Sequence, residues 1–290
     1  MKGNRFLDTT INTFTDIIYF VLTLFLRISR LKNLETDPIF SNKRNTILIC
    51  NGPSLSESID WIQNERKASE LYVTHYFARS ELFFKLKPEF YIFVDSLFWS
   101  ENVQEYYKRE NSKIFDILEK INWKMSIIVP VSGFKYLRKK IKNKNISFKK
   151  IVTWSVNFNS EYLTIFCLKK KLITPFCSSA AILALWHAIL RERKNIFLFG
   201  VDFSHFKDYS VDQITNEVTL LNSHFYKNSK AENSLNKRLN RSFEFHTTFS
   251  KISLSFYQMY LLSRVAFLKE IKIINGSKNS YLNYFPRLKK

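Results

Sequence analysis

The chain has 290 residues, of which 46% are hydrophobic and 24% charged, with only five Gly and six Pro. This composition excludes collagen-like and low-complexity chains and predicts a globular protein that can bury a sizeable core. A formal net charge of +20 favours anionic partners such as nucleic acid, anionic lipid or phosphorylated substrates. The three cysteines form no C-x-x-C pair, which indicates free buried thiols rather than a disulfide framework or a zinc knuckle.

Residues 1–45 are predicted to be a segment that associates with a membrane, followed by a linker. An apolar run at 17–26 is about half as long as the roughly 20 residues that a spanning helix needs, and no small-residue cleavage site follows it. We therefore expect a helix that lies in the membrane interface. A helix packed on the protein's own core is the alternative. The side chains expected to meet the membrane are Phe20, Leu24, Arg27 and Arg30.

Residues 46–290 are predicted to form one α/β domain, because short apolar runs alternate with segments of helical spacing. The expected strands are 46–50, 71–74, 90–94, 125–130, 195–199 and 271–274, and the expected helices are 100–120, 178–190 and 247–268. This alternation predicts a mostly parallel sheet with helices on both faces. The basic residues 135–150 are interpreted as a solvated helix face, and the polar stretch 207–242 as a lid or flexible loop.

Ligands of such sheets bind outside the carboxyl ends of the strands. Gly52, directly after the first strand, lets the backbone approach a ligand, and the helix start behind it offers N–H groups to a phosphate. A plain tight turn is the alternative at this position. The strand-end residues expected to bind a nucleotide are Asn51, Gly52, Pro53, Ser54, His75, Asp95, Ser96, Gly200, Asp202, Asn275 and Ser277.

Several short motifs follow one another along residues 46–280. They are Cys-Asn-Gly-Pro-Ser-Leu at 50–55, Ser-Leu-Phe at 96–98, Ile-Thr at 173–174 before a small-residue helix, Phe-Leu-Phe-Gly-Val-Asp-Phe at 197–203, and His246 after a polar loop. In order and spacing they resemble the bacterial sialyltransferases of glycosyltransferase family 42 and the related flagellin-modifying motility accessory factors. The resemblance implies a Rossmann-like fold of the GT-A-variant type.

The resemblance also implies an inverting, metal-independent glycosyltransferase that uses no cofactor. It would move a nonulosonic acid, sialic acid first of all, from a CMP-sugar donor to a cell-surface glycan or glycolipid acceptor such as lipopolysaccharide. His246 would be the general base, with His224 as its rival, and Thr174 would contact the nucleotide. The family's Tyr directly after the Gly-Ile-Asp-Phe block is Ser204 here, so Tyr209 and His205 are expected at the leaving phosphate.

The expected location is cytoplasmic, at the periphery of the inner membrane, and the family's behaviour leaves a homo-oligomer open. Alternatives within the enzymes are a transferase of Kdo, pseudaminic acid or another nucleotide-linked sugar. A non-catalytic basic membrane-surface protein is the alternative outside them. Nucleic acid is not expected as a partner, because no helix-turn-helix, RNA-recognition or zinc pattern is visible.

Overall fold

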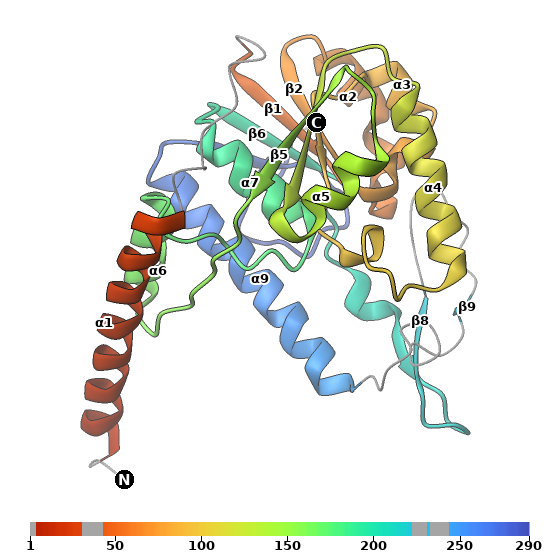
Figure 1. Ribbon diagram of the computed structural model, residues 1–290. Helices are drawn as coiled ribbons and strands as arrows, with labels where there is room; N and C mark the ends of the chain where they lie inside the picture. The colour runs from red at the N-terminus through yellow and green to blue at the C-terminus, as the bar shows by residue number, and fades with distance from the viewer. Residues whose placement is uncertain (1–3, 31–42, 222–230, 233–243, 290) are drawn as a thin grey trace.

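The computed structural model describes residues 4–30, 43–221, 231–232 and 244–289 (Figure 1). Its centre is a seven-stranded sheet in which every pairing is parallel, in the order β10-β6-β1-β2-β3-β4-β5. The strands are β1 (Asn45–Ile49), β2 (Ser69–Thr74), β3 (Phe90–Ile92), β4 (Met125–Pro130), β5 (Ile146–Ile151), β6 (Asn195–Phe199) and β10 (Lys272–Asn275). The predicted Rossmann-like α/β fold class is confirmed by this topology.

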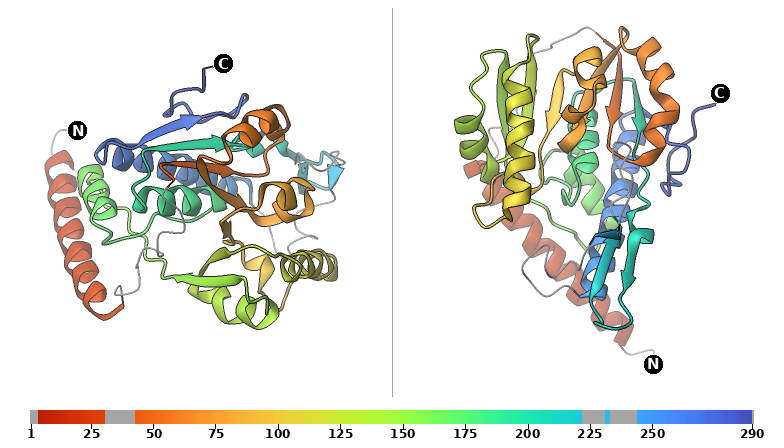
Figure 2. Two further views of the ribbon diagram at one scale, coloured as in Figure 1. Left: turned by 90° about the horizontal axis from the view of Figure 1, so that it is seen from above. Right: turned by 90° about the vertical axis from the view of Figure 1, so that its right-hand side faces the viewer.

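Helices cover both faces of the sheet (Figure 2). The α-helices are α1 (Asn4–Arg30), α2 (Ile59–Glu65), α3 (Leu82–Leu86), α4 (Glu105–Glu119), α5 (Val131–Lys140), α6 (Glu161–Lys169), α7 (Ala180–Leu190) and α9 (Phe245–Phe267). Successive strand residues point to opposite faces, so Leu48 of β1 belongs to the core with α7 and α9, whereas Ile47 and Ile49 belong to the core with α2, α3, α4 and α5.

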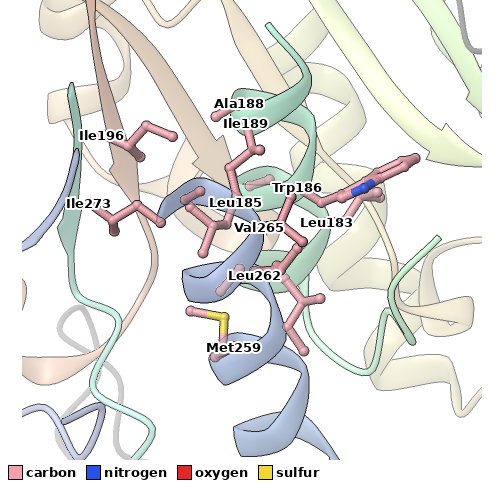
Figure 3. Packing of buried hydrophobic residues seen from close by; sticks show 14 of the residues in the cluster. Leu183, Leu185, Trp186, Ala188, Ile189, Ile196, Met259, Leu262, Val265 and Ile273 are labelled. Atoms are coloured by element: carbon pink, nitrogen blue, oxygen red, sulfur yellow. The ribbon is translucent and has the colours of Figure 1, made fainter. Parts of the chain in front are cut away.

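Helix α7 is enclosed within the fold, since all eleven of its residues are buried. Leu185 and Ile189 lie in the same core cluster as Met259 and Leu262 of α9 (Figure 3). His187 donates to or accepts from the Tyr72 hydroxyl at 2.9 Å inside this core. A helix enclosed on all sides is apolar all round, which explains the Ala- and Leu-rich sequence of α7. Its packing in this core holds the start of α7 in place relative to the sheet.

Two segments differ from their sequence-based predictions. Residues 135–150 supply the end of α5 and also the edge strand β5, which was not predicted. Within 207–242, β7 (Tyr209–Val211), β8 (Val218–Leu221) and β9 (Ala231–Glu232) pair into a small antiparallel sheet rather than an irregular loop. Residues 222–230 and 233–242 lie outside the described residues, and the role of 207–242 as a lid stays a prediction.

Helix α1 stands at the edge of the molecule beside α6 (Figures 1 and 2). Its Asp16 carboxylate is buried and accepts hydrogen bonds from the backbone N–H groups of Asn159 and Ser160, both at 2.8 Å. Thr23 accepts a hydrogen bond from the Trp154 indole at 3.4 Å. One narrow stripe of α1 therefore packs on the protein.

The outer surface of α1 is apolar and exposed. Phe20 packs against the core, so it turns away from this surface, whereas Leu24 belongs to it. Arg27 and Arg30 close the helix. The exposed apolar side chains, which we call the α1 apolar face, are Ile11, Phe14, Ile17, Ile18, Tyr19, Val21, Leu22, Leu24 and Phe25. Among the described helices, none combines the length and the apolar character that crossing a bilayer requires.

Candidate functional site

A cavity of about 580 Å³ opens at the carboxyl ends of β2, β3, β4 and β5, beside the start of α7. We call it the strand-end cavity. Its polar side chains are His75, Asp95, Ser96, Ser132, Thr153, Ser155, Ser178, Ser179 and Lys251, and Val94, Trp99, Pro130, Pro175, Phe176 and Cys177 complete the wall. Ligand sites of this size are typically apolar with a few placed polar groups. This one is rich in hydroxyls, which suits a sugar or a phosphate.

The wall formed by β2 and β3 carries three predicted residues. His75 begins the 3₁₀ helix η3 (His75–Arg79) with a φ of 43°, a left-handed value that is uncommon outside glycine. Its ring packs against Phe98. The Asp95 carboxylate accepts a hydrogen bond from Leu97 N–H at 3.0 Å and so caps η4 (Ser96–Phe98). The structure therefore brings His75, Asp95 and Ser96 together, as their strand-end positions predict.

The opposite wall follows β5 and leads into α7. Thr174 is buried and exchanges two hydrogen bonds with the backbone of Trp154, one through its N–H at 2.7 Å and one through its Oγ1 at 2.9 Å. These bonds fix the segment after β5 that carries Thr153 and Ser155 into the cavity. In this geometry Thr174 holds the cavity wall, and its predicted contact with a nucleotide stays a prediction.

Cys177 lies in the same wall as a free thiol. Burial raises its pKa to about 12, so the thiol is protonated at neutral pH. A protonated thiol is neither a strong nucleophile nor a good metal ligand. The other two cysteines, Cys50 and Cys167, are also free, with pKa values raised by burial to about 12 and about 11.

The turns after β1 and β6 meet directly at the point where the chain order of the sheet reverses. Gly52 N–H donates to the Gly200 carbonyl at 2.9 Å, and a Cβ on Gly52 would lie 2.5 Å from both that oxygen and the Asp202 carboxylate. Gly200 itself has a φ of 62°. Glycine at 52 is thus required by the approach of two turns, which favours the tight-turn alternative for its role.

Asp202 holds the 52–54 turn and also lines a cavity beside it. It is buried, and its carboxylate accepts hydrogen bonds from both the N–H and the hydroxyl of Ser54. A second cavity of about 590 Å³, the turn cavity, lies outside this contact. Its lining residues are Pro53, Ser54, Glu57, Asp202, Ser204, Lys207, Asn279, Ser280 and Tyr281.

Three more predicted residues use their side chains inside the protein. Asn51 donates to the Thr74 carbonyl at 3.2 Å and ties β1 to β2. Asn275 donates to Ser280 Oγ at 3.0 Å and accepts from the Ser277 N–H at 3.0 Å. Ser277 Oγ accepts from Val201 N–H at 2.9 Å. This network supports the turns that line the turn cavity.

The predicted catalytic side chains lie around the start of α9. Tyr209 of β7 packs against the rings of Phe245 and Phe249, with centroids 6.4 Å apart in each case. The His246 side chain is 77% exposed, lies 3.5 Å from Glu244, and is absent from the described lining of both cavities. His224 lies outside the described residues. The structure brings Tyr209 near the start of α9 but does not bring His246 into either cavity.

His205 begins η5 (His205–Asp208) and contacts the Phe203 ring. Desolvation lowers the pKa of His205, and the nearby Asp208 offsets part of this shift. The imidazole is therefore neutral at pH 7 and can offer a leaving phosphate one N–H donor but no positive charge.

Sequence reasoning missed six polar lining residues of the strand-end cavity: Ser132, Thr153, Ser155, Ser178, Ser179 and Lys251. Thr153 and Ser155 follow β5, so recognising that strand would have placed them at the carboxyl edge. Lys251 lies within a predicted helix, and no local pattern marks it. Among the residues that the structure describes, no group of three or more His, Cys, Asp or Glu side chains is arranged to hold a metal ion.

No protein-family model and no curated protein matches this chain. Among solved structures, it is similar to the MAf glycosyltransferase from Magnetospirillum magneticum AMB-1, with a TM-score of 0.48 and 11% sequence identity. The match covers 86% of this chain and 34% of that one, so the chain spans about a third of the length of the structure that it matches.

Proposed function

We propose that this protein is a glycosyltransferase that transfers a nonulosonic acid, sialic acid first of all, from a CMP-sugar to a cell-surface glycan such as lipopolysaccharide. One observation carries the proposal: a hydroxyl-rich cavity with one acidic and one basic side chain lies at the carboxyl edge of a parallel sheet. Activated-nucleotide ligands bind at this edge in open α/β sheets. The motifs at 50–55, 96–98, 173–174 and 197–203 narrow the donor by their resemblance to family 42.

The reaction is a single displacement. An oxygen of the acceptor attacks the anomeric carbon, the bond from that carbon to the phosphate oxygen breaks, and CMP leaves with the bonding electrons, so the configuration inverts. His246 takes the proton of the acceptor hydroxyl, with His224 as the rival base. The resemblance to family 42 assigns hydrogen bonds to the leaving phosphate to Tyr209 and His205, which are absent from the described lining of both cavities. Neither a metal ion nor a cofactor takes part.

The protein acts at the cytoplasmic surface of the inner membrane. The α1 apolar face is exposed, and the sequence places Arg27 and Arg30 at its end. A helix of this kind lies in the interface with its apolar side among the acyl chains and its basic residues near anionic headgroups. Such an anchor holds the enzyme beside a lipid-linked acceptor.

The first test is calorimetric titration with CMP and UMP, followed by a CMP-sialic acid hydrolysis assay. We expect selective binding of CMP, hydrolysis that persists in EDTA, and a loss of about 100-fold or more in His246→Ala, the scale of a lost general base. Ser250→Ala, exposed on the same helix, is the matched control and keeps full activity. His224→Ala decides between the two candidate bases.

The alternatives give different results. Binding of a nucleotide other than CMP, with hydrolysis of its sugar conjugate, indicates a transferase of another nucleotide-linked sugar. CMP binding with unchanged hydrolysis in both His variants moves the base elsewhere. An absence of nucleotide binding, together with tight vesicle binding, contradicts the enzyme and supports a non-catalytic membrane-surface protein.

A further inference from the structure

The strand-end cavity is lined by one lysine, Lys251, and nothing in the motifs assigns it a role. Within the described residues it forms no ion pair, whereas the lysines at 43, 113, 269 and 278 each bind a glutamate at 2.6–2.9 Å. The carboxylate that shares its cavity, Asp95, is engaged by the Leu97 N–H. A lysine held beside a cavity without a protein counter-ion is suited to an anionic ligand.

The register of α9 fixes where this ammonium group lies. Lys251, Ser255 and Gln258 share one helix face because they are spaced i, i+4 and i+7. Ser255 hydrogen-bonds Ser178 at 2.6 Å, and Gln258 accepts from the Phe176 N–H at 3.1 Å. The face of α9 that carries Lys251 is therefore clamped onto the loop that leads into α7.

The start of α7 supplies neutral donors to the same place. Its N-cap Ser179 makes no capping hydrogen bond, and within the described residues the buried Ser179 Oγ has no partner. The first N–H groups of a helix have no partner within it, and α7 is enclosed in a low-dielectric core that strengthens its field. Ser179, at the start of α7, and Lys251 of α9 thus line the same cavity.

We propose that Lys251 binds the phosphate of the nucleotide donor, together with Ser179 and the start of α7. Its positive charge makes the protein bind a nucleotide more tightly than the corresponding nucleoside. The identity of the nucleotide in this inference rests on the proposed function. The contact between Lys251 and a phosphate does not depend on it.

The test compares CMP with cytidine, and UMP with uridine, by calorimetry on the full chain. In Lys251→Gln we expect the affinity for CMP to fall by about 10- to 100-fold, the effect of losing a charged hydrogen bond. Cytidine affinity stays unchanged, and Lys251→Arg restores most of the CMP affinity. Lys139→Gln, an exposed change of the same charge on α5, leaves all four affinities as in the wild type.

Other results either overturn the proposal or separate it from the identity of the donor. CMP affinity that is unchanged in Lys251→Gln removes the lysine from the site, and a CMP loss in Lys207→Gln instead places the phosphate in the turn cavity. Equal losses for CMP and cytidine show a structural effect, which thermal melting of the variant checks. If the wild type binds UMP as well as CMP, the assignment of a CMP-linked donor fails. The difference between the affinities for UMP and uridine in Lys251→Gln still tests whether Lys251 binds the phosphate. Binding of neither nucleotide overturns both proposals.

Discussion

Gly52 is the residue on which the arrangement of the strand ends depends most directly. The Asp202 carboxylate and the Gly200 carbonyl oxygen occupy the space that a Cβ on residue 52 would need, so the turns after β1 and β6 are in contact. In Gly52→Ala the two turns must separate, and overpacking of this kind costs about 1–3 kcal/mol. Urea unfolding measures the loss, with Ser56→Ala on the exposed side of the same turn expected within about 0.5 kcal/mol of the wild type. Equal stability of the two variants would contradict the close approach.

Glu70 carries the second residue-scale prediction. It is fully buried and pairs with Arg191 at 2.8 Å and Arg193 at 2.7 Å. Glu70→Gln leaves two buried guanidinium groups without their counter-ion, which costs about 3–5 kcal/mol. Glu105→Gln, which removes the exposed partner of Lys108, costs no more than about 1 kcal/mol. Chemical unfolding of both variants decides whether the buried cluster differs from the surface pair.

His187 predicts how stability depends on pH. Burial lowers its pKa well below the ordinary value, and Lys149 and Arg191 lower it further. The unfolded chain therefore binds a proton at a pH where the folded protein does not, so stability is complete above about pH 6.5 and falls as the pH drops below it. In His187→Gln this part of the slope disappears. An identical slope in the variant, measured by urea unfolding between pH 5 and 8, would rule the histidine out.

The elements show which parts of the fold can be predicted from sequence. Four strands, β1, β3, β4 and β6, are buried on both faces. Such strands are continuous apolar runs, so the sequence pattern was sufficient to predict them. β5 is an edge strand whose lysines are tolerated because one side meets solvent, and its charge mimicked a helix face. Thr153 and Ser155 were missed with it, whereas Asp95 was found because β3 was found.

Helix α1 is fastened to the rest of the protein mainly by one carboxylate. Asp16 accepts three hydrogen bonds from Asn159 and Ser160 at 2.8–3.1 Å, at the start of α6. Asp16→Ala leaves the two backbone donors without a partner, at a cost of about 1–3 kcal/mol. We expect faster amide exchange throughout α1 and unchanged exchange in α7. Thr15→Ala, which removes only a hydrogen bond to Ile11 within the helix, is the matched control.

At the scale of the whole molecule, the apolar and basic surfaces are expected to bind a membrane through separable contributions. In the proposed membrane-bound state, the α1 apolar face is buried among acyl chains at any salt concentration, whereas the net charge of +20 attracts anionic headgroups through a field that salt screens. Binding to phosphatidylglycerol vesicles should weaken between about 0.05 and 0.5 M salt but not vanish.

Changing the apolar face separates the two contributions. Phe14 and Phe25 are 65% and 73% exposed on α1, and Phe267, 71% exposed at the end of α9, is a matched aromatic outside that face. We expect Phe14→Ser with Phe25→Ser to abolish vesicle binding at high salt and Phe267→Ser to leave it unchanged. Size-exclusion chromatography is the companion measurement. If the double variant converts a dimer to a monomer and vesicle binding is unaffected, the α1 apolar face joins two copies of this chain, and the anchoring of the enzyme at the membrane is contradicted.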